Sequence, residues 1–310
     1  MHAIEIEGLS KSYSVGFLKK QLRPALKGLT LAVSAGETFG FLGPNGAGKT
    51  TTLKLLMGLI FPTSGSATIL GKDYRDPDVR KRIGFLPEQP YFYDYLSAPE
   101  VLDYYGRLSG LSASARKQRI PDVLVGVGLG DVANKQLRKF SKGMLQRVGI
   151  AQAIIHDPEV IFLDEPMSGL DPLGRHEIRE LIQGLKDAGK TVFFSTHILS
   201  DAEALCDRVA VIHKGELRGV GVMKDLRSGG GDKSEVIWEG ASALPVVQRL
   251  VLDSHVTAEL VRATVKCADL DSLLEALRQQ RARLVSVTPL HGTLEEYFLE
   301  KTSEPEAGGV

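Results

Sequence analysis

The sequence predicts an α/β fold in which helices cover both faces of a mostly parallel sheet, followed by a small α+β unit. Two observations predict the sheet: short, β-rich apolar runs at residues 37–42, 159–163 and 190–195, and helical periodicity in the stretches between them. A third observation, the glycine-rich stretch at 228–231, separates the C-terminal part. The length of 310 residues agrees with one large domain and one smaller domain.

The elements of the first half follow from local patterns. Residues 3–7 alternate apolar and polar side chains like a half-buried strand, and a second strand is predicted at 26–33, after an unusual stretch at 16–24. The run at 37–42 leads directly into glycines. After these glycines, Leu53, Leu56, Met57 and Ile60 recur at helical spacing and predict the core face of a helix. Residues 90–139 are predicted to be helical.

The C-terminal part shows a strand–helix–strand–strand–helix–strand order, which suggests a small ferredoxin-like unit with one extra helix. The predicted elements are strand 235–238, helix 244–252, strands 257–260 and 262–266, helix 270–280, strand 283–287 and helix 294–301. We therefore expect a nucleotide-binding domain at 1–227, a linker at 228–232, an α+β domain at 233–302 and a disordered tail at 303–310.

Composition limits the class of partner. Lys and Arg total 38, and Asp and Glu also total 38, so the formal net charge is zero. Because proteins that bind nucleic acid usually carry a net basic domain, no nucleic-acid partner is expected. Cys206 and Cys267 are far apart and form no CxxC pair, which disfavours a disulfide framework and a zinc site. No run of about 18 apolar residues and no signal peptide is found, so we expect a soluble intracellular chain.

A phosphate-binding loop is predicted between the strand at 37–42 and the helix that follows. The sequence GPNGAGKT at 43–50 matches GxxxxGK[ST] in the strand–helix context that supports the motif. Lys49 would reach the β- and γ-phosphates of a nucleotide, and the Thr50 hydroxyl would ligate Mg²⁺. A glycine-rich turn that binds nothing is the alternative. The predicted nucleotide-binding residues are Gly43, Pro44, Asn45, Gly46, Ala47, Gly48, Lys49, Thr50 and Thr51.

Two acids end the apolar run at 160–163. Ligands of open α/β sheets bind at the carboxyl ends of strands, where Asp164 and Glu165 are expected to lie. Asp164 suits the Mg²⁺ shell, directly or through water, and Glu165 suits a general base for the attacking water. The alternative is an acid pair that merely begins a turn.

Further motifs resemble those of ATP-binding cassette (ABC) proteins. The stretch 140–147, FSKGMLQR, resembles a variant of the family's signature motif, and SGLD at 168–171 resembles its D-loop. His197 resembles the switch histidine, Gln89 the Q-loop glutamine and Tyr13 the aromatic residue that stacks on adenine. These elements cover residues 1 to about 226 in the family's order. The resemblance implies a P-loop NTPase fold with antiparallel N-terminal strands and a helical subdomain at about 90–140.

The resemblance also implies roles for these residues. Ser141, Lys142 and Gly143, at the start of a predicted helix, would face the γ-phosphate of ATP bound by a second subunit, with Asp171 nearby. His197 would donate to the γ-phosphate, and Gln89 would contact Mg²⁺ or the attacking water. Lys142 and Met144 depart from the commonest signature. Lys142 would either assist charge neutralisation or point to solvent.

Residues 85–105 hold seven of the chain's 20 aromatic side chains, including five of its eight tyrosines. Tyrosine is enriched at protein interfaces, although an internal aromatic cluster is an equal alternative. In ABC proteins this region docks a membrane permease. The stretch 287–299 resembles the C-termini of type-2 ABC exporter ATPases, and we expect the C-terminal unit to act in dimerisation or regulation, or only to stabilise the chain.

The expected function is an ATPase subunit that uses ATP and Mg²⁺ to drive transport, in the manner of an exporter, through a separate multi-span permease. Its expected partner is a second ATP-binding subunit, in a homodimer, and its expected location is cytoplasmic and peripheral, on the inner face of the cell membrane. One alternative is a soluble ABC ATPase that acts on ribosomes or nucleic acid. It is disfavoured because the stretch between Lys49 and Ser141 holds no sustained heptads and the chain has one cassette. A small-molecule kinase would have no use for Ser141, Asp171 and His197.

Overall fold

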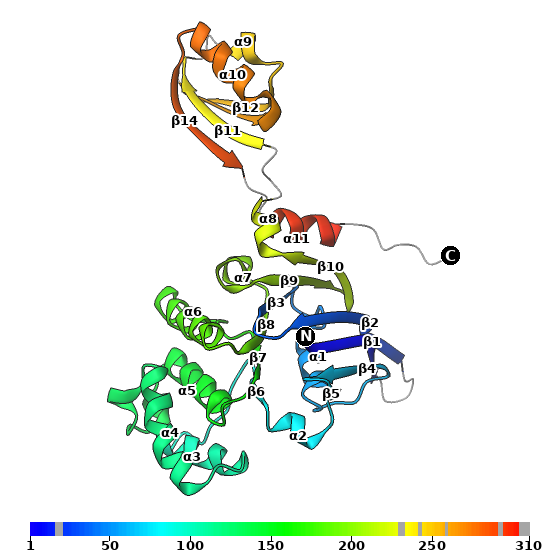
Figure 1. Ribbon diagram of the computed structural model, residues 1–310, viewed down its shortest axis with the longest axis vertical. Helices are drawn as coiled ribbons and strands as arrows, with labels where there is room; N and C mark the ends of the chain where they lie inside the picture. The colour runs from blue at the N-terminus through cyan, green and yellow to red at the C-terminus, as the bar shows by residue number, and fades with distance from the viewer. Residues whose placement is uncertain (16–20, 229–232, 241–243, 258–259, 291–293, 304–310) are drawn as a thin grey trace. The chain divides into compact units, whose positions relative to one another are not determined.

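The computed structural model divides the chain into two compact units, Met1–Gly221 and Val222–Val310. The division falls ahead of residue 227 because helix α8 (Met223–Ser228) packs against α11 (Leu294–Ser303). The described residues are 1–15, 21–228, 233–240, 244–257, 260–290 and 294–303 (Figure 1). Except for Ser228 and Ser303, which end these two helices, the predicted linker at 228–232 and the tail at 303–310 lie outside the described residues.

The first unit is built on a six-stranded sheet with the order β10-β9-β3-β8-β7-β6. The pairs β6–β7, β7–β8, β8–β3 and β3–β9 are parallel, so the carboxyl ends of these strands lie at one edge. Every residue of β3, β7 and β8 is buried, which agrees with the β-rich runs predicted there. The strands are β3 (Thr38–Leu42), β6 (Ile83–Leu86), β7 (Val160–Asp164), β8 (Thr191–Thr196), β9 (Arg208–His213) and β10 (Glu216–Val222).

Helices cover both faces of this sheet, as predicted. Helix α1 (Lys49–Leu56) packs against β7 and β2. On the other side of the sheet, α5 (Lys142–Ile154) packs against β6, α6 (Pro172–Asp187) against β8, and α7 (Leu199–Leu205) against β3 and β8 (Figure 1). The two layers therefore bury the central strands completely, as their apolar sequences require.

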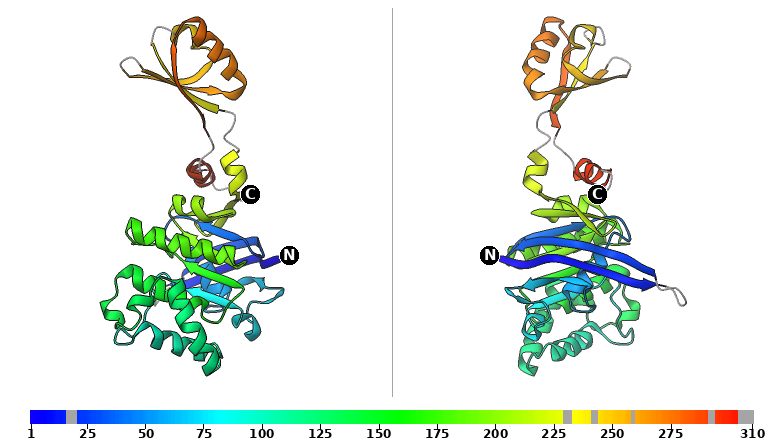
Figure 2. Two further views of the ribbon diagram at one scale, coloured as in Figure 1. Left: turned by 60° about the vertical axis from the view of Figure 1, so that its left-hand side comes forward. Right: turned by 90° about the vertical axis from the view of Figure 1, so that its right-hand side faces the viewer.

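A separate antiparallel sheet at the N-terminus has the order β2-β1-β4-β5. Strands β1 and β2 form a long ribbon (Figure 2), in which Tyr13 lies opposite Arg23. The strand predicted at 26–33 therefore begins earlier and includes residues 21–24 of the unusual stretch, while residues 16–20 lie outside the described ranges. The strands are β1 (His2–Val15), β2 (Gln21–Ser34), β4 (Ser64–Ile69) and β5 (Lys72–Asp73).

The stretch at 90–139 is mainly helical from residue 98 onward, whereas residues 90–97 are irregular apart from a short turn and an isolated bridge between Ser97 and Gln136. Helix α3 begins with a capping box formed by Ser97 and Glu100, which explains where the helical structure begins. The helical segments from residue 77 to 139 are α2 (Pro77–Arg80), α3 (Ala98–Leu108), α4 (Ala113–Gly126) and the 3-10 turns η1 (Gly130–Val132) and η2 (Leu137–Lys139).

The second unit contains a four-stranded antiparallel sheet with the order β12-β13-β11-β14, the arrangement of a ferredoxin-like unit. Two local predictions were wrong. The helix predicted at 244–252 ends at Val247, and the strand predicted at 257–260 lies earlier because pairing with β13 draws Val251 and its neighbours into a strand. The elements are β11 (Lys233–Glu239), α9 (Leu244–Val247), β12 (Val251–Thr257), β13 (Leu260–Lys266), α10 (Cys267–Gln279) and β14 (Arg283–Leu290).

Candidate functional site

The phosphate-binding loop connects β3 to α1, as the sequence predicts. Gly48 caps the helix with φ 113°, a conformation that side chains rarely adopt, and Gly46 has φ 80°. A Cβ at Gly48 would lie only 2.7 Å from the carbonyl oxygen of Ala25. Position 48 therefore requires glycine for both space and conformation, and the loop curls tightly around the start of α1.

Lys49 lies in the curve of this loop and is 5% exposed. Its Nζ donates hydrogen bonds to the carbonyl oxygens of Gly43 at 2.7 Å and Pro44 at 3.3 Å. The same Nζ lies 3.0 Å from Glu165 Oε1. The attraction between a buried ammonium and a buried carboxylate is offset by the free energy needed to remove both groups from water. A contribution to stability therefore does not by itself explain why the pair is present.

Glu165 and His197 follow the neighbouring strands β7 and β8, whose carboxyl ends meet at one edge of the sheet. His197 Nδ1 lies 2.8 Å from Glu165 Oε2, while Oε1 faces Lys49. Glu165 has φ 48°, which is uncommon for a residue with a side chain and costs of order 1 kcal/mol. Local strain and two charged or polar partners together fix this carboxylate in one position.

Asp164 lies one residue earlier, and its carboxylate is fixed by a hydrogen bond from the neighbouring strand β8. The Ser195 hydroxyl donates to Asp164 Oδ1 at 2.6 Å, and the backbone N–H of Glu165 donates to Ser195 Oγ at 3.0 Å. Ser195 is fully buried and positions both acids. The sequence analysis did not select it, because a serine inside an apolar strand shows its partner only when β7 and β8 are paired.

A cavity of about 300 Å³ lies in front of these groups. Its lining includes six of the predicted loop residues, among them Lys49, together with Glu165 and His197, which are distant from the loop in sequence. Gly43, Pro44 and Ala47 shape the loop without lining the cavity. The lining residues are Ala25, Asn45, Gly46, Gly48, Lys49, Thr50, Thr51, Glu88, Glu165, Ser168 and His197.

Gln89 and Tyr13, predicted from motifs outside the phosphate loop, are also absent from this lining. Glu88, in the bend after β6, lines the cavity, whereas its exposed neighbour Gln89 does not. Gln89 was selected by its resemblance to the Q-loop glutamine, and its contact with Mg²⁺ or the attacking water stays a prediction. Tyr13 also lies outside the lining. It is 39% exposed, and the Lys11 ammonium lies 5.3 Å from the centroid of its ring.

The predicted signature residues line a different cavity, of about 430 Å³. Ser141 caps α5 and accepts a hydrogen bond from the Met144 N–H at 3.2 Å. Asp171 caps α6 and accepts from the Gly174 N–H at 2.8 Å. Both helix N-termini open on this cavity, which Lys142 and Gly143 also line, and N-termini favour anionic groups. One chain therefore carries two anion-attracting sites with different side chains.

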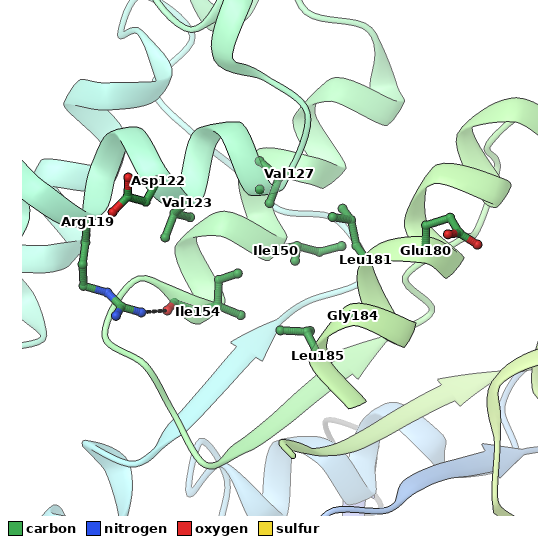
Figure 3. A pocket seen from close by; sticks show the side chains of 11 residues that line it. Arg119, Asp122, Val123, Val127, Ile150, Ile154, Glu180, Leu181, Gly184 and Leu185 are labelled. Atoms are coloured by element: carbon green, nitrogen blue, oxygen red, sulfur yellow. Dashed lines mark hydrogen bonds between the residues drawn. The ribbon is translucent and has the colours of Figure 1, made fainter. Parts of the chain in front are cut away.

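A cavity of about 390 Å³ between α4, α5 and α6 has a different character (Figure 3). Its wall is mainly aliphatic, with Val123, Ile150 and Leu181 among the lining residues. Arg119 also lines this cavity, and its guanidinium donates to the carbonyl oxygens of Ile154 and Ile155 at the end of α5. This cavity has no phosphate loop and none of the predicted catalytic groups, so the chemistry belongs to the cavity lined by Lys49.

The aromatic segment forms a fourth hollow, of about 250 Å³, beside α3. Tyr104 and Tyr105 meet edge to face with centroids 5.3 Å apart, and Phe92 meets Tyr105 in the same way at 6.3 Å. Tyr91 is nevertheless 86% exposed. The segment therefore combines internal ring packing with exposed tyrosines, and the lining residues are Tyr91, Phe92, Tyr93, Leu96, Val101, Tyr104 and Tyr105.

A phosphate loop on α1 with an acid pair at the end of a neighbouring buried strand defines a P-loop nucleoside triphosphatase. The sequence pattern of the family described as ABC transporter matches residues 26–168. The chain is 46% identical to the uncharacterized ABC transporter ATP-binding protein sll0415 of Synechocystis sp., over 98% of this chain and 85% of the relative. It therefore belongs to the ABC transporter family, as an ATP-binding subunit.

Other relatives and solved structures agree. The ABC transporter ATP-binding protein NatA of Bacillus subtilis is 43% identical over 67% of this chain and 86% of its own length. The bacitracin transport ATP-binding protein BcrA of Bacillus licheniformis is 46% identical over 61% of this chain and 62% of its own length. The dimeric structure of MJ0796, a bacterial ABC transporter cassette, matches with a TM-score of 0.64 at 28% identity, covering 71% of this chain and 98% of MJ0796.

Within the described residues, no helix has the length and apolar composition that crossing a bilayer requires.

Proposed function

We propose that this chain is the ATP-hydrolysing subunit of an exporter and drives a separate membrane permease. The observation that carries this proposal is the convergence of Lys49, Glu165 and His197 on one cavity in front of the phosphate loop. Names of relatives such as the bacitracin transport protein BcrA support export.

The residues of the cavity suit hydrolysis of a phosphoanhydride. Loop amides and the Lys49 ammonium would hold the phosphates, and Glu165 would orient and deprotonate the attacking water. The ion pair between Lys49 and Glu165 would have to open first, because the triphosphate competes for the lysine. His197 holds Glu165 through Nδ1, which leaves its other ring nitrogen for the γ-phosphate.

The donor set in the cavity fits magnesium bound together with the nucleotide. Thr50 lines the cavity, and buried Asp164, one residue before Glu165, has its carboxylate fixed by Ser195. These two oxygens are hard ligands of the kind that Mg²⁺ prefers, and they would hold the ion directly or through water. When bound, Mg²⁺ would supply charge neutralisation for the phosphates.

Two copies would be needed to enclose each nucleotide. Ser141, Lys142, Gly143 and Asp171 line a cavity separate from the phosphate loop of their own chain. In the proposed dimer they would reach the nucleotide bound by the partner, in keeping with the dimeric MJ0796 cassette. ATP binding would close the dimer, and hydrolysis would reopen it. This conformational change would be transmitted to the permease.

The exposed tyrosines around the aromatic hollow are the proposed docking surface for the permease. Docking there would hold the chain on the inner face of the cell membrane. Tyr13 remains the proposed contact to adenine, at the edge of the β1–β2 ribbon.

The test uses the variant Glu165→Gln, which keeps the shape of the side chain but removes the general base. We expect ATP hydrolysis to fall by about 10²–10⁴-fold and an ATP-bound dimer to accumulate. Hydrolysis would be measured by phosphate release and the dimer by light scattering after size exclusion. Exposed Glu180→Gln on α6 is the matched control, and it should hydrolyse ATP at the parent rate.

A variant that stays monomeric at saturating Mg-ATP would contradict the sandwich mechanism. The same variant, used to capture partners from detergent-solubilised membranes, should recover a multi-span membrane protein. Recovery of ribosomes or nucleic acid without such a protein would instead favour a soluble ABC ATPase.

A further inference from the structure

Glu88 places an uncompensated carboxylate at the nucleotide cavity. Its side chain is exposed and lines the cavity that also contains Lys49, Glu165 and His197. Lys49 faces Glu165, and His197 contacts the same carboxylate through Nδ1, while neither residue pairs with Glu88. Across the described part of the chain, Glu88 has no hydrogen-bond or ion-pair partner. Phosphates in this cavity would add negative charge beside it.

Among the described residues, Lys142 places an unpaired positive charge at the cavity lined by the predicted signature residues, called the signature cavity below. It is the first residue of α5, and its side chain is exposed. Its Nζ lies against Gly169, at the place where a side chain on that residue would begin, so the ammonium is held over the loop that precedes α6. No acid among the described residues pairs with it, whereas neighbouring Arg147 lies 3.6 Å from Glu177.

The position of Lys142 is electrostatically unfavourable in a single chain. A positive charge in the first turn of a helix opposes the helix dipole, at a cost of about 0.3–1 kcal/mol. No acidic residue in the first turn of α5 offsets it. A cation at this point is therefore explained better by an anionic group that reaches it from another molecule.

Among the described residues, each cavity holds one charged side chain without a hydrogen-bond or ion-pair partner. In the nucleotide cavity it is the Glu88 carboxylate, and in the signature cavity, where Arg147 faces Glu177 and Asp171 caps α6, it is the Lys142 ammonium. Each chain carries both, which is the condition for a twofold-symmetric contact in which each residue meets its counterpart on the other copy. Opposite charges that meet across an interface set its register and stabilise it.

We propose that Lys142 of the partner subunit pairs with Glu88 when two copies close on ATP, so that each nucleotide site is completed by one ion pair between subunits. The inference rests on the two-copy arrangement under the proposed function. Glu88 then acts as a positioning residue that directs the partner's lysine toward the nucleotide, and the pair couples ATP binding to alignment of the signature motif.

A double-mutant cycle tests the pair, because it isolates the interaction between two residues from their separate effects. The background is full-length Glu165→Gln with Mg-ATP, and the variants are Glu88→Gln, Lys142→Met and the two combined. The dimer dissociation constant would be measured by analytical ultracentrifugation. ATP binding to the monomer would be measured separately for each variant with a fluorescent nucleotide analogue.

We expect each single change to weaken the dimer by about 5–30-fold, and the combined change to weaken it no further than the stronger single change. Raising the salt concentration should weaken the background dimer more than the combined variant. Glu180→Gln and Lys117→Met are matched controls, since they make the same chemical changes at exposed residues outside both cavities, and they should leave the constant unchanged. Lys142→Arg should retain most of the affinity.

Two results would overturn the pairing while leaving the proposed function intact. If the effects of Glu88→Gln and Lys142→Met simply multiply, Lys142 acts on the phosphate or on its own chain. If Lys142→Met leaves the dimer constant unchanged, the lysine stays over Gly169. A background that fails to dimerise with ATP would instead overturn the proposed function, and the pairing with it.

Discussion

The two units of the chain bury different kinds of side chain. The first unit hides Lys49, Asp164, Glu165 and Asp201 in its interior. Among the described residues of the second unit, Ser234 is the buried polar side chain, and the core is formed by aliphatic residues around Trp238. A ferredoxin-like sheet with one face covered by helices accounts for the apolar residues of this second core.

This difference in buried charged side chains indicates that the functional site lies in the first unit. Buried charges cost free energy unless they are paired, and even then apolar residues of the same size would often be as stable. Asp201 is paired with Arg175 of α6, whereas Lys49, Asp164 and Glu165 meet at one edge of the first sheet and mark a site arranged for chemistry. The core of the second unit, in contrast, is accounted for by packing alone.

The largest expected effect breaks the buried pair of the first unit. Lys49→Ala should weaken ATP binding by at least about 100-fold, since the phosphates lose their buried ammonium. It should also lower the free energy of unfolding of the first unit by about 3 kcal/mol, because Glu165 stays buried without one of its partners. Isothermal titration calorimetry and chemical denaturation measure the two effects.

Lys54→Ala provides the control for this change, since Lys54 is an exposed lysine on the same helix. Tight ATP binding by Lys49→Ala would contradict the assignment of residues 43–50 as a phosphate-binding loop. Loss of ATP binding without loss of stability would mean that the pair with Glu165 is easily replaced by water.

The second expected effect concerns the second unit alone. Leu273→Ala removes a fully buried side chain of α10 and should cost about 2–5 kcal/mol in that unit. Trp238 is the chain's single tryptophan and is fully buried there, so its fluorescence follows unfolding of this unit. ATP hydrolysis under native conditions should change by less than about twofold.

Leu274→Ala is the matched control, because Leu274 is only partly buried at the same core and should cost less. A large loss of ATPase activity in Leu273→Ala, with the first unit still folded, would show that the second unit takes part in catalysis rather than only in packing.

The smallest effect distinguishes the two cysteines. Burial raises the pKa of the Cys206 thiol in the first unit well above its usual value, so little reactive thiolate forms near neutral pH. Cys267 in the second unit is exposed. A maleimide should therefore label one thiol quickly, and Cys267→Ser should abolish this label while leaving ATP hydrolysis unchanged. Rapid labelling of Cys267→Ser would show that the first unit opens readily.

Much of the site could be predicted from sequence because its motifs are contiguous. The phosphate loop, the acid pair and His197 each follow a β-rich run, and parallel strands must bring their carboxyl ends together. Gln89 was selected by its resemblance to the Q-loop glutamine, whereas only the tertiary structure places its neighbour Glu88 in the lining of the cavity. The early end of α9 likewise depends on pairing between β12 and β13, which local periodicity does not contain.

By itself the sequence determined the fold class, the phosphate loop and the family, because each depends on contiguous motifs or on the short periodicity of apolar residues in helices and strands. The tertiary structure decided how these pieces act on one another. It placed Glu165 between Lys49 and His197, and it set Ser195 behind Asp164. These are contacts between residues distant in sequence, and their geometry is fixed only when strands pair and buried charges must find partners.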